Sequence, residues 1–233
     1  MQNNIDLALI ESRAEQSAAM IYHYDLKNRR KFPYVPTRII DDFFETPGAV
    51  RAFALRQEFR KSVDSTFPGE RTAYLNLLDD QLFAVFAKKL LDNLPGIHGF
   101  SKLTATFHSI DETYGNGWVH DDEPKYNVVG VVYLNPNPPP RSGTILYKDQ
   151  FDSTAGDFLE YFKKDVLFAN EEERKQLVEI RNKQRSMFTP TTVVENVFNR
   201  CVIYDPRTWH SPDHFFGKTR EDARLTLVFF AEL

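Results

Sequence analysis

The spacing of apolar residues changes from a helical to a strand-like period near residue 100. Before this point, apolar side chains recur every three or four positions and predict helices. Thr46 and Pro47 make a helix start, with threonine as the N-cap and proline in the first turn. The predicted elements are helices over residues 5–24, 47–59 and 80–94, with Asp79 or Asp80 as the start of the third, and a short strand over residues 38–44.

From Lys102 onward the apolar residues alternate with polar ones, which is the period of a half-buried β-strand. Turn-forming Gly, Asn, Asp and Pro residues separate the apolar runs. The eight expected strands are 103–110, 117–120, 126–135, 144–147, 192–198, 201–204, 210–216 and 224–232. Helices followed by eight short strands predict a mainly β fold, a cupin-like jelly roll or double-stranded β-helix with supporting helices.

A helical pattern over residues 157–187 interrupts the strands between the fourth and the fifth. We expect one domain over residues 1–233, with residues 1–100 as helical support and residues 101–233 as the jelly-roll core that carries the insert. The apolar side of the insert requires a covering surface. A lid beside the site mouth is the favoured interpretation, and contact with a second copy of the chain in a homodimer is the alternative to a monomer.

Charge and cysteine content narrow the class of protein. The net charge of −4 and the absence of a long basic stripe argue against a nucleic-acid partner. The single cysteine, Cys201, lies in an apolar run and is expected to be a buried, inert thiol. No apolar run approaches the length of a membrane helix and no leader pattern opens the chain, so we expect a cytoplasmic protein without a membrane partner.

The residues that carry chemistry lie in three separate segments of the second half. His120 and Asp122 are two positions apart on an expected strand and therefore share a face. His210, from a later strand, would complete a 2-His-1-carboxylate triad, which leaves coordination positions open and usually holds Fe(II) in non-haem oxygenases. Arg224, with Thr226 on the same face, offers the cation that a carboxylate-bearing co-substrate would require.

Neighbouring residues receive less specific interpretations. Asp121 is one position off the ligand face and is expected to point away. His108 is expected to pack or hydrogen-bond within its strand, and His214 cannot form a helical metal pair with His210 because a proline lies between them. Trp118 shares a face with His120 and is expected at the site mouth, whereas Trp209 is expected in the core.

These motifs resemble the 2-oxoglutarate- and Fe(II)-dependent dioxygenase superfamily, and within it the prolyl-hydroxylase-like branch. The resemblance covers about residues 100–233, and the first third is more loosely similar to small bacterial or phage-type members. It rests on His120-x-Asp122, the strand Val131-Val-Tyr-Leu-Asn135, Ser142-Gly-Thr144, His210 and Arg224-x-Thr226.

The resemblance implies that the triad holds Fe(II) and that 2-oxoglutarate and dioxygen are co-substrates. Arg224 would bind the distal carboxylate of 2-oxoglutarate, with Tyr133 and Thr226 as neutral donors. The expected reaction is hydroxylation of an unactivated C–H bond, with succinate and CO2 as products. A prolyl or other peptidyl substrate is expected by analogy, and a free amino acid or small metabolite is the alternative.

Two other classes remain open from the residues alone. A jelly-roll metalloenzyme such as a metal-dependent hydrolase would use the same triad with another ion. Arg224, Tyr133 and Thr226 count against it, because a hydrolase has no need to bind a distal carboxylate. A non-catalytic metal-binding protein is the other class, and the complete set of expected ligands counts against it.

Overall fold

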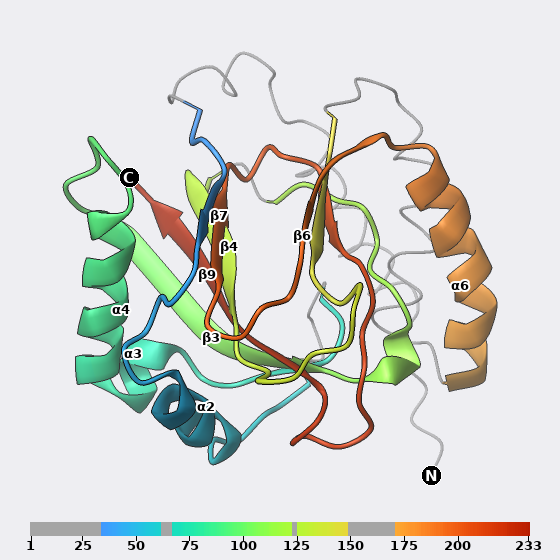
Figure 1. Ribbon diagram of the computed structural model, residues 1–233, viewed down its shortest axis with the longest axis horizontal. Helices are drawn as coiled ribbons and strands as arrows, with labels where there is room; N and C mark the ends of the chain where they lie inside the picture. The colour runs from blue at the N-terminus through green and yellow to red at the C-terminus, as the bar shows by residue number, and fades with distance from the viewer. Residues whose placement is uncertain (1–33, 62–66, 123–124, 149–170) are drawn as a thin grey trace, which may run out of the picture.

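The computed structural model describes residues 34–61, 67–122, 125–148 and 171–233 of the chain (Figure 1). The helix expected over residues 5–24 and the first part of the insert, residues 157–170, lie outside these ranges. Two antiparallel sheets form the body of the protein, with helices on opposite sides of it (Figure 1). Within the described residues, no helix has both the length and the apolar character needed to cross a membrane.

The larger sheet has six strands in the order β1-β7-β4-β9-β3-β2. All of its neighbouring strands pair antiparallel. The strands are β1 (Arg38–Ile40), β2 (Glu70–Arg71), β3 (Lys102–Ile110), β4 (Val128–Tyr133), β7 (Cys201–Tyr204) and β9 (Arg224–Glu232). The central strands β4 and β9 therefore pair with each other, and their outer neighbours are β7 and β3.

The smaller sheet has three strands in the order β6-β5-β8. They are β5 (Thr144–Tyr147), β6 (Pro190–Val194) and β8 (His210–Pro212). An isolated bridge pairs His120 with His210 and adds the segment around His120 to the free side of β8. Two packed antiparallel sheets of this connectivity form the jelly roll that the sequence predicts.

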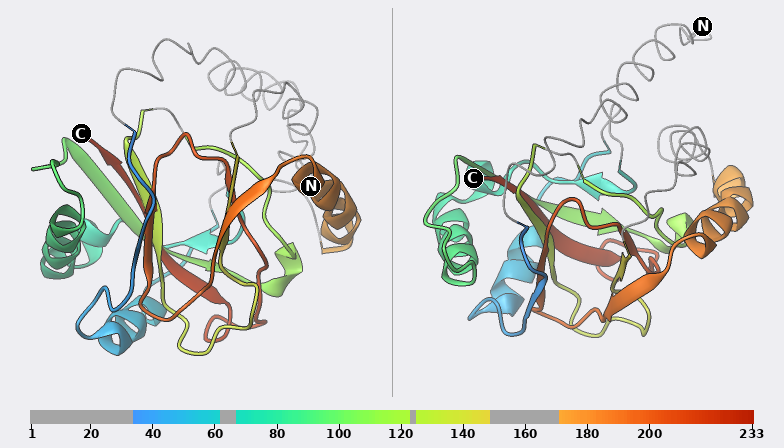
Figure 2. Two further views of the ribbon diagram at one scale, coloured as in Figure 1. Left: turned by 45° about the horizontal axis from the view of Figure 1, so that its top comes forward. Right: turned by 90° about the horizontal axis from the view of Figure 1, so that it is seen from above.

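Three helices cover the outer face of the larger sheet and a fourth lies at the other end of the molecule (Figures 1 and 2). The covering helices are α2 (Pro47–Leu55), α3 (Leu75–Leu78) and α4 (Asp80–Asp92), and the distant one is α6 (Glu171–Ser186). A short 3-10 turn, η2 (Glu112–Tyr114), approaches α6. The main core lies between α2–α4 and the sheet, where Phe86 packs edge-on against Phe229.

The opposite face of the larger sheet points toward the smaller sheet and carries a second cluster. Val129, Val131 and Tyr133 of β4 alternate toward this side, and the alternate residues of β4 face the helices. Polar residues of β9 and β3 share the inner face. The interior between the two sheets is therefore the place where a polar site can be built.

Several expected elements are confirmed in detail and others are shorter. The bounds of β5, β7 and β9 match the expected strands, and Cys201 is buried. Asp79 caps α4 by accepting from the Leu82 amide at 2.9 Å, whereas Thr46 makes no side-chain cap bond at the start of α2. The strand from His210 ends at Pro212, because proline has no amide hydrogen with which to continue a ladder.

The segment 117–120 is not the continuous strand that we expected. His120 pairs with His210, but the backbone groups of Val119 bond to a side chain of α6. The Gly117 amide donates to the Pro212 carbonyl at 3.3 Å. A Cβ at position 117 would lie 2.5 Å from the Pro212 ring, so only glycine permits this close approach.

Candidate metal site

The structure brings His120, Asp122 and His210 together at one end of the space between the sheets. One potential ligand atom from each residue lies within 4.8 Å of the others. The His210 Nε2 atom is 3.6 Å from Asp122 Oδ2, and the two imidazole centroids are 4.3 Å apart. This arrangement offers two nitrogen ligands and one oxygen ligand from one side, the donor set of a facial triad.

Backbone hydrogen bonds fix the relative position of these residues. The His120 amide donates to the His210 carbonyl at 3.0 Å, and the His210 amide donates to the His120 carbonyl at 2.8 Å. The Asp122 amide donates to the Pro206 carbonyl at 2.9 Å. All the ligand positions are therefore tied to the loop and strand from Pro206 to His210.

Each imidazole is oriented by a carbonyl two residues earlier. The Nδ1 atom of His120 is 2.9 Å from the Trp118 carbonyl, and that of His210 is 2.9 Å from the Thr208 carbonyl. A carbonyl only accepts, so Nδ1 carries the hydrogen and Nε2 keeps its lone pair for a metal. Burial and the neighbouring His120 hold the pKa of His210 well below its usual value, so His210 is in the neutral, ligating form.

Helix α6 holds the segment that leads to His120. Gln184 accepts from the Val119 amide at 2.9 Å and donates to the Val119 carbonyl at 2.7 Å. The side-chain amide thus satisfies both backbone groups of Val119, as a neighbouring strand would. Arg181, which is fully buried, donates to the Tyr114 carbonyl and to Asn116 on the same segment.

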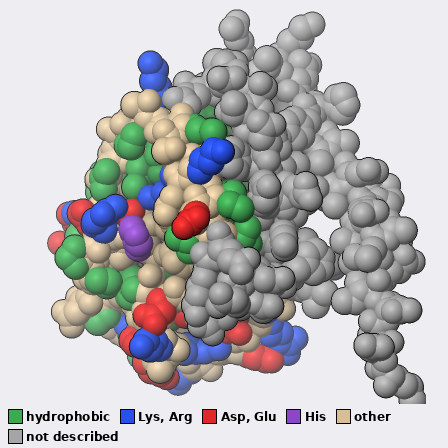
Figure 3. Space-filling model, turned by 90° about the vertical axis from the view of Figure 1, so that its right-hand side faces the viewer, with side chains coloured by type: hydrophobic (Ala, Val, Ile, Leu, Met, Phe, Trp, Pro, Cys, Tyr) green, Lys and Arg blue, Asp and Glu red, His purple; other side chains and the backbone are tan. Residues whose placement is uncertain are grey.

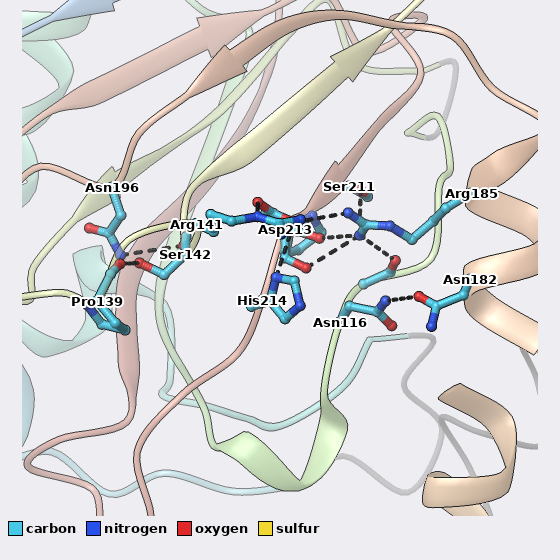
Figure 4. A network of polar contacts seen from close by, with 12 residues as sticks. Asn116, Pro139, Arg141, Ser142, Asn182, Arg185, Asn196, Ser211, Asp213 and His214 are labelled. Atoms are coloured by element: carbon cyan, nitrogen blue, oxygen red, sulfur yellow. Dashed lines mark hydrogen bonds and ion pairs between the residues drawn. The ribbon is translucent and has the colours of Figure 1, made fainter. Parts of the chain in front are cut away.

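The same helix also reaches the segment that carries His210 (Figure 4). Arg185 donates to Ser211 Oγ at 3.1 Å and to the Pro212 carbonyl at 2.8 Å, and it pairs with Asp213 at 3.1 Å. It also donates to the Gly117 carbonyl at 3.2 Å. The described part of the insert therefore holds both metal-ligand segments through hydrogen bonds.

These hydrogen bonds change the interpretation of the insert. Leu177 is buried within the single chain, so its burial does not require a second copy of the chain. The lid or dimer contact expected for the insert, residues 157–187, stays a prediction, because residues 157–170 lie outside the described residues. On the right-hand side of the molecule in Figure 1, hydrophobic, acidic and basic side chains intermingle over the described part of the surface (Figure 3).

A buried cationic group lies on the inner face of the larger sheet. Arg224, which is 3% exposed, donates from Nε to the Ser142 carbonyl at 3.1 Å. Its guanidinium carbon is 5.5 Å from the centre of the Tyr133 ring. Burial lowers the pKa of Arg224, and within the described residues no carboxylate pairs with it.

Two neutral hydroxyl groups accompany this cation. Tyr133 and Thr226 are directly opposite each other on β4 and β9, and both are fully buried. The Tyr133 hydroxyl bonds Thr144 Oγ1 at 2.7 Å, and burial raises its pKa. Thr226 Oγ1 is buried with no partner among the described residues. An unpartnered buried hydroxyl beside an unpaired guanidinium fits the distal carboxylate of a co-substrate.

One cavity of about 120 Å³ connects the metal ligands with Arg224. Tyr133 and Thr226 do not line it, but the Tyr133 hydroxyl bonds Thr144, which does. The polar and charged residues on its wall are Arg71, His108, Tyr114, Asn116, His120, Asp122, Thr144, Tyr204, His210 and Arg224. The triad and the guanidinium therefore face the same cavity.

The structure also places the tryptophan, histidine and aspartate residues that neighbour the motifs in the sequence. Trp118 lines the cavity, whereas Asp121 does not. His108 bonds the Pro68 carbonyl at 2.6 Å, and burial holds its pKa well below its usual value. Trp209 packs beside a core cluster, and the exposed His214 bonds Asp213.

Tyr204 and Arg71 line the cavity, but neither was predicted from the sequence as a site residue. Tyr204 of β7 places its ring 4.6 Å from the His210 ring, and alternation along β7 was the available signal. Arg71 lies on the two-residue strand β2, which has no periodic pattern of its own. Nothing in the sequence distinguishes Arg71 from a surface arginine.

Comparison with solved structures shows what fold the chain has. HygX from Streptomyces hygroscopicus with nickel and 2-oxoglutarate bound superposes with a TM-score of 0.53 at 13% identity, covering 89% of this chain and 87% of HygX. Its iron-bound form gives a TM-score of 0.50 at 14% identity, with the same coverage. A Pseudomonas putida prolyl-4-hydroxylase gives 0.47 at 15% identity, covering 85% and 92%. The likeness to HygX establishes the fold.

Sequence comparison gives a family. No curated protein matches the chain. The model of one family, described as a family of unknown function, matches residues 34–231 and so spans both sheets and every residue of the candidate site. The chain belongs to this family, DUF6445.

Proposed function

We propose that this protein is a 2-oxoglutarate- and Fe(II)-dependent oxygenase that hydroxylates a C–H bond. The observation that carries the proposal is the joint geometry of the cavity. A 2-His-1-carboxylate set and a buried guanidinium with no carboxylate partner among the described residues open onto the same cavity. A hydrolase would use the first feature and leave the second without a role.

His120 and His210 would hold Fe(II) through Nε2, and Asp122 through its carboxylate. The bound metal would supply the activation of dioxygen, with 2-oxoglutarate converted to succinate and CO2 and the substrate C–H bond converted to C–OH. The carbonyls of Trp118 and Thr208 keep both imidazoles in the ligating tautomer. The ring of Tyr204 packs against His210 and restricts rotation of that ligand.

Arg224 would bind the distal carboxylate of 2-oxoglutarate. A buried carboxylate is costly without a partner, and a guanidinium remains charged and can donate to both of its oxygens. Thr226 would donate its hydroxyl, which has no partner among the described residues. Tyr133, whose pKa is raised by burial, stays protonated and keeps a donor hydrogen.

The solved relatives of the fold support this proposal. HygX was crystallised with nickel and 2-oxoglutarate, and also with iron. Those ligands are properties of HygX, and their transfer to this chain depends on the residues described above. Membership of the prolyl-hydroxylase-like branch stays a prediction, as does a peptidyl or amino-acid substrate.

An anaerobic titration tests the proposal directly. Fe(II) is added to the protein without dioxygen, and 2-oxoglutarate follows while the visible spectrum is recorded. We expect a weak metal-to-ligand charge-transfer band that saturates with one equivalent of 2-oxoglutarate. Asp122→Ala should abolish the band, and Asp121→Ala is the matched control that should retain it. Metal binding without any band for the native protein would contradict the proposal and favour a different metalloenzyme.

A further inference from the structure

A second arginine faces the cavity from the edge of the larger sheet. The register places Arg71 of β2 opposite His108 of β3, His108 opposite Thr226 of β9, and Thr226 opposite Tyr133 of β4. Residues that are opposite across neighbouring strands point to the same face. Arg71 therefore lies in the same row as the hydroxyl groups near Arg224, and His108 separates the two sites.

The guanidinium of Arg71 stacks against aromatic rings. Its central carbon is 3.5 Å from the centre of the Phe67 ring and 5.9 Å from that of Phe230. Its Nε is buried without a hydrogen-bond partner, and within the described residues no carboxylate forms an ion pair with it. Stacking covers a face of the guanidinium, so an incoming anion would approach the terminal N–H groups in its plane.

Burial makes this cation costly, although it remains charged. Burial lowers the pKa of Arg71 to about 10, and the nearby carboxylate of Asp122 opposes the shift. His108, which lies beside Arg71, supplies no negative charge. It is neutral, and its ring nitrogen bonds the Pro68 carbonyl. An incoming anion would relieve the cost of burying Arg71 without a partner.

The charges on the described wall of the cavity also favour binding of an anion. They comprise two guanidinium groups, from Arg71 and Arg224, and a single carboxylate, from Asp122. With a divalent metal bound, Asp122 is a ligand, and the cavity carries excess positive charge. The dianion 2-oxoglutarate neutralises all of this excess except one unit. A singly charged anion at Arg71 would complete the balance.

We propose that Arg71 binds a carboxylate group of the primary substrate, so that the enzyme acts on a carboxylic acid. This inference rests on the proposed function, because it assigns Arg224 to the co-substrate. A carboxylate suits the site better than a phosphate dianion, because a single charge remains to be neutralised. Its planar pair of oxygens also matches the donors that the stacked guanidinium leaves free.

The test compares carboxylates with their uncharged amides. The anaerobic protein, loaded with Fe(II) and saturating 2-oxoglutarate, is titrated calorimetrically with acetate, hexanoate, benzoate and N-acetylglycine, and with the four corresponding amides. We expect the best-bound carboxylate to bind about tenfold or more tightly than its amide, as a charge-assisted pair would give. Inorganic phosphate is titrated in parallel.

Substitutions at Arg71 test whether its guanidinium is the group that binds the carboxylate. Arg71→Met should remove the preference for carboxylates and leave 2-oxoglutarate binding unchanged, whereas Arg71→Lys should retain part of the preference. Arg220→Met is the matched control, because Arg220 also stacks on a phenylalanine, Phe59, but pairs with Glu70 and does not line the cavity. It should behave as the native protein.

Several outcomes would overturn the inference. They are equal binding of all four pairs by the native protein, an undiminished carboxylate preference in Arg71→Met, and tighter binding of phosphate than of every carboxylate. Loss of 2-oxoglutarate binding in Arg71→Met would make Arg71 the co-substrate residue instead. If the native protein binds neither Fe(II) nor 2-oxoglutarate, the proposed function fails, and the same eight titrations on the metal-free protein still decide whether the cavity selects a carboxylate.

Discussion

Replacing Gln184 by leucine tests whether helix α6 holds the metal-ligand segment in place. The native amide bonds both the amide and the carbonyl of Val119, the residue before His120. Gln184 is 4% exposed and Val119 is 3% exposed, so water cannot easily replace the lost partner. Leucine keeps a similar volume and removes both hydrogen bonds.

The structure sets the size of the expected effect. Each buried backbone group left without a partner costs about 1–3 kcal/mol, and leucine also removes the buried polar groups of glutamine itself. We therefore expect the free energy of unfolding of the metal-free protein to fall by about 2–4 kcal/mol. Because Val119 precedes His120, we also expect metal affinity to fall by about 10- to 100-fold, as for the loss of other outer supports of metal ligands.

Two measurements check these values. Urea unfolding of the metal-free protein gives the free-energy change, and a competition titration with Ni(II) and a chelator gives the change in affinity. Lys183→Ala is the matched control, because Lys183 is exposed on the same helix. If Gln184→Leu matched the control in both measurements, α6 would not be the support of the metal ligands that the hydrogen bonds indicate.

Three further predictions concern the site and the sheet that carries it. Asp122→Ala should abolish Ni(II) binding by calorimetry while Asp121→Ala retains it, and the reverse result would shift the ligand strand by one residue. Arg224→Ala should weaken 2-oxoglutarate binding about 100-fold or more without a comparable loss of metal affinity, and unchanged affinity would place the co-substrate elsewhere. Gly130→Ala should lower the free energy of unfolding by about 2 kcal/mol or more, because its Cβ would lie 2.0 Å from the Val202 carbonyl oxygen. Gly48→Ala in α2 is the control, since a Cβ there meets nothing within 4 Å.

Periodicity predicted the parts of the fold that depend on local burial. The strands from Thr144, Cys201 and Arg224 have the predicted bounds, because both faces or alternate faces of these segments are buried. The sequence also predicted that His120 and Asp122 lie together, although His120 forms only an isolated bridge and Asp122 lies outside any strand. These features depend on the residues of a single segment, and a single sequence contains that information.

Contacts between distant segments could not be predicted in the same way. Arg71 enters the cavity because β2 pairs with β3, and a two-residue strand gives no signal of its register. Gln184 bonds only the backbone amide and carbonyl of Val119, so the valine side chain gives no sign of this contact. Such contacts depend on which backbone atoms the fold exposes, and the sequence pattern does not record them.

The reciprocal backbone bonds between His120 and His210 have a consequence for how the protein gains and loses its metal. The two amides protect each other, so we expect them to exchange with deuterium in one shared opening event, which bound metal would slow equally for both. The two segments are far apart in the chain, so their contact closes a long loop, and we expect it to form after the more local contacts. A newly made chain would therefore capture metal only after both sheets have assembled, and local opening of this one bridge would release it without unfolding the rest of the jelly roll.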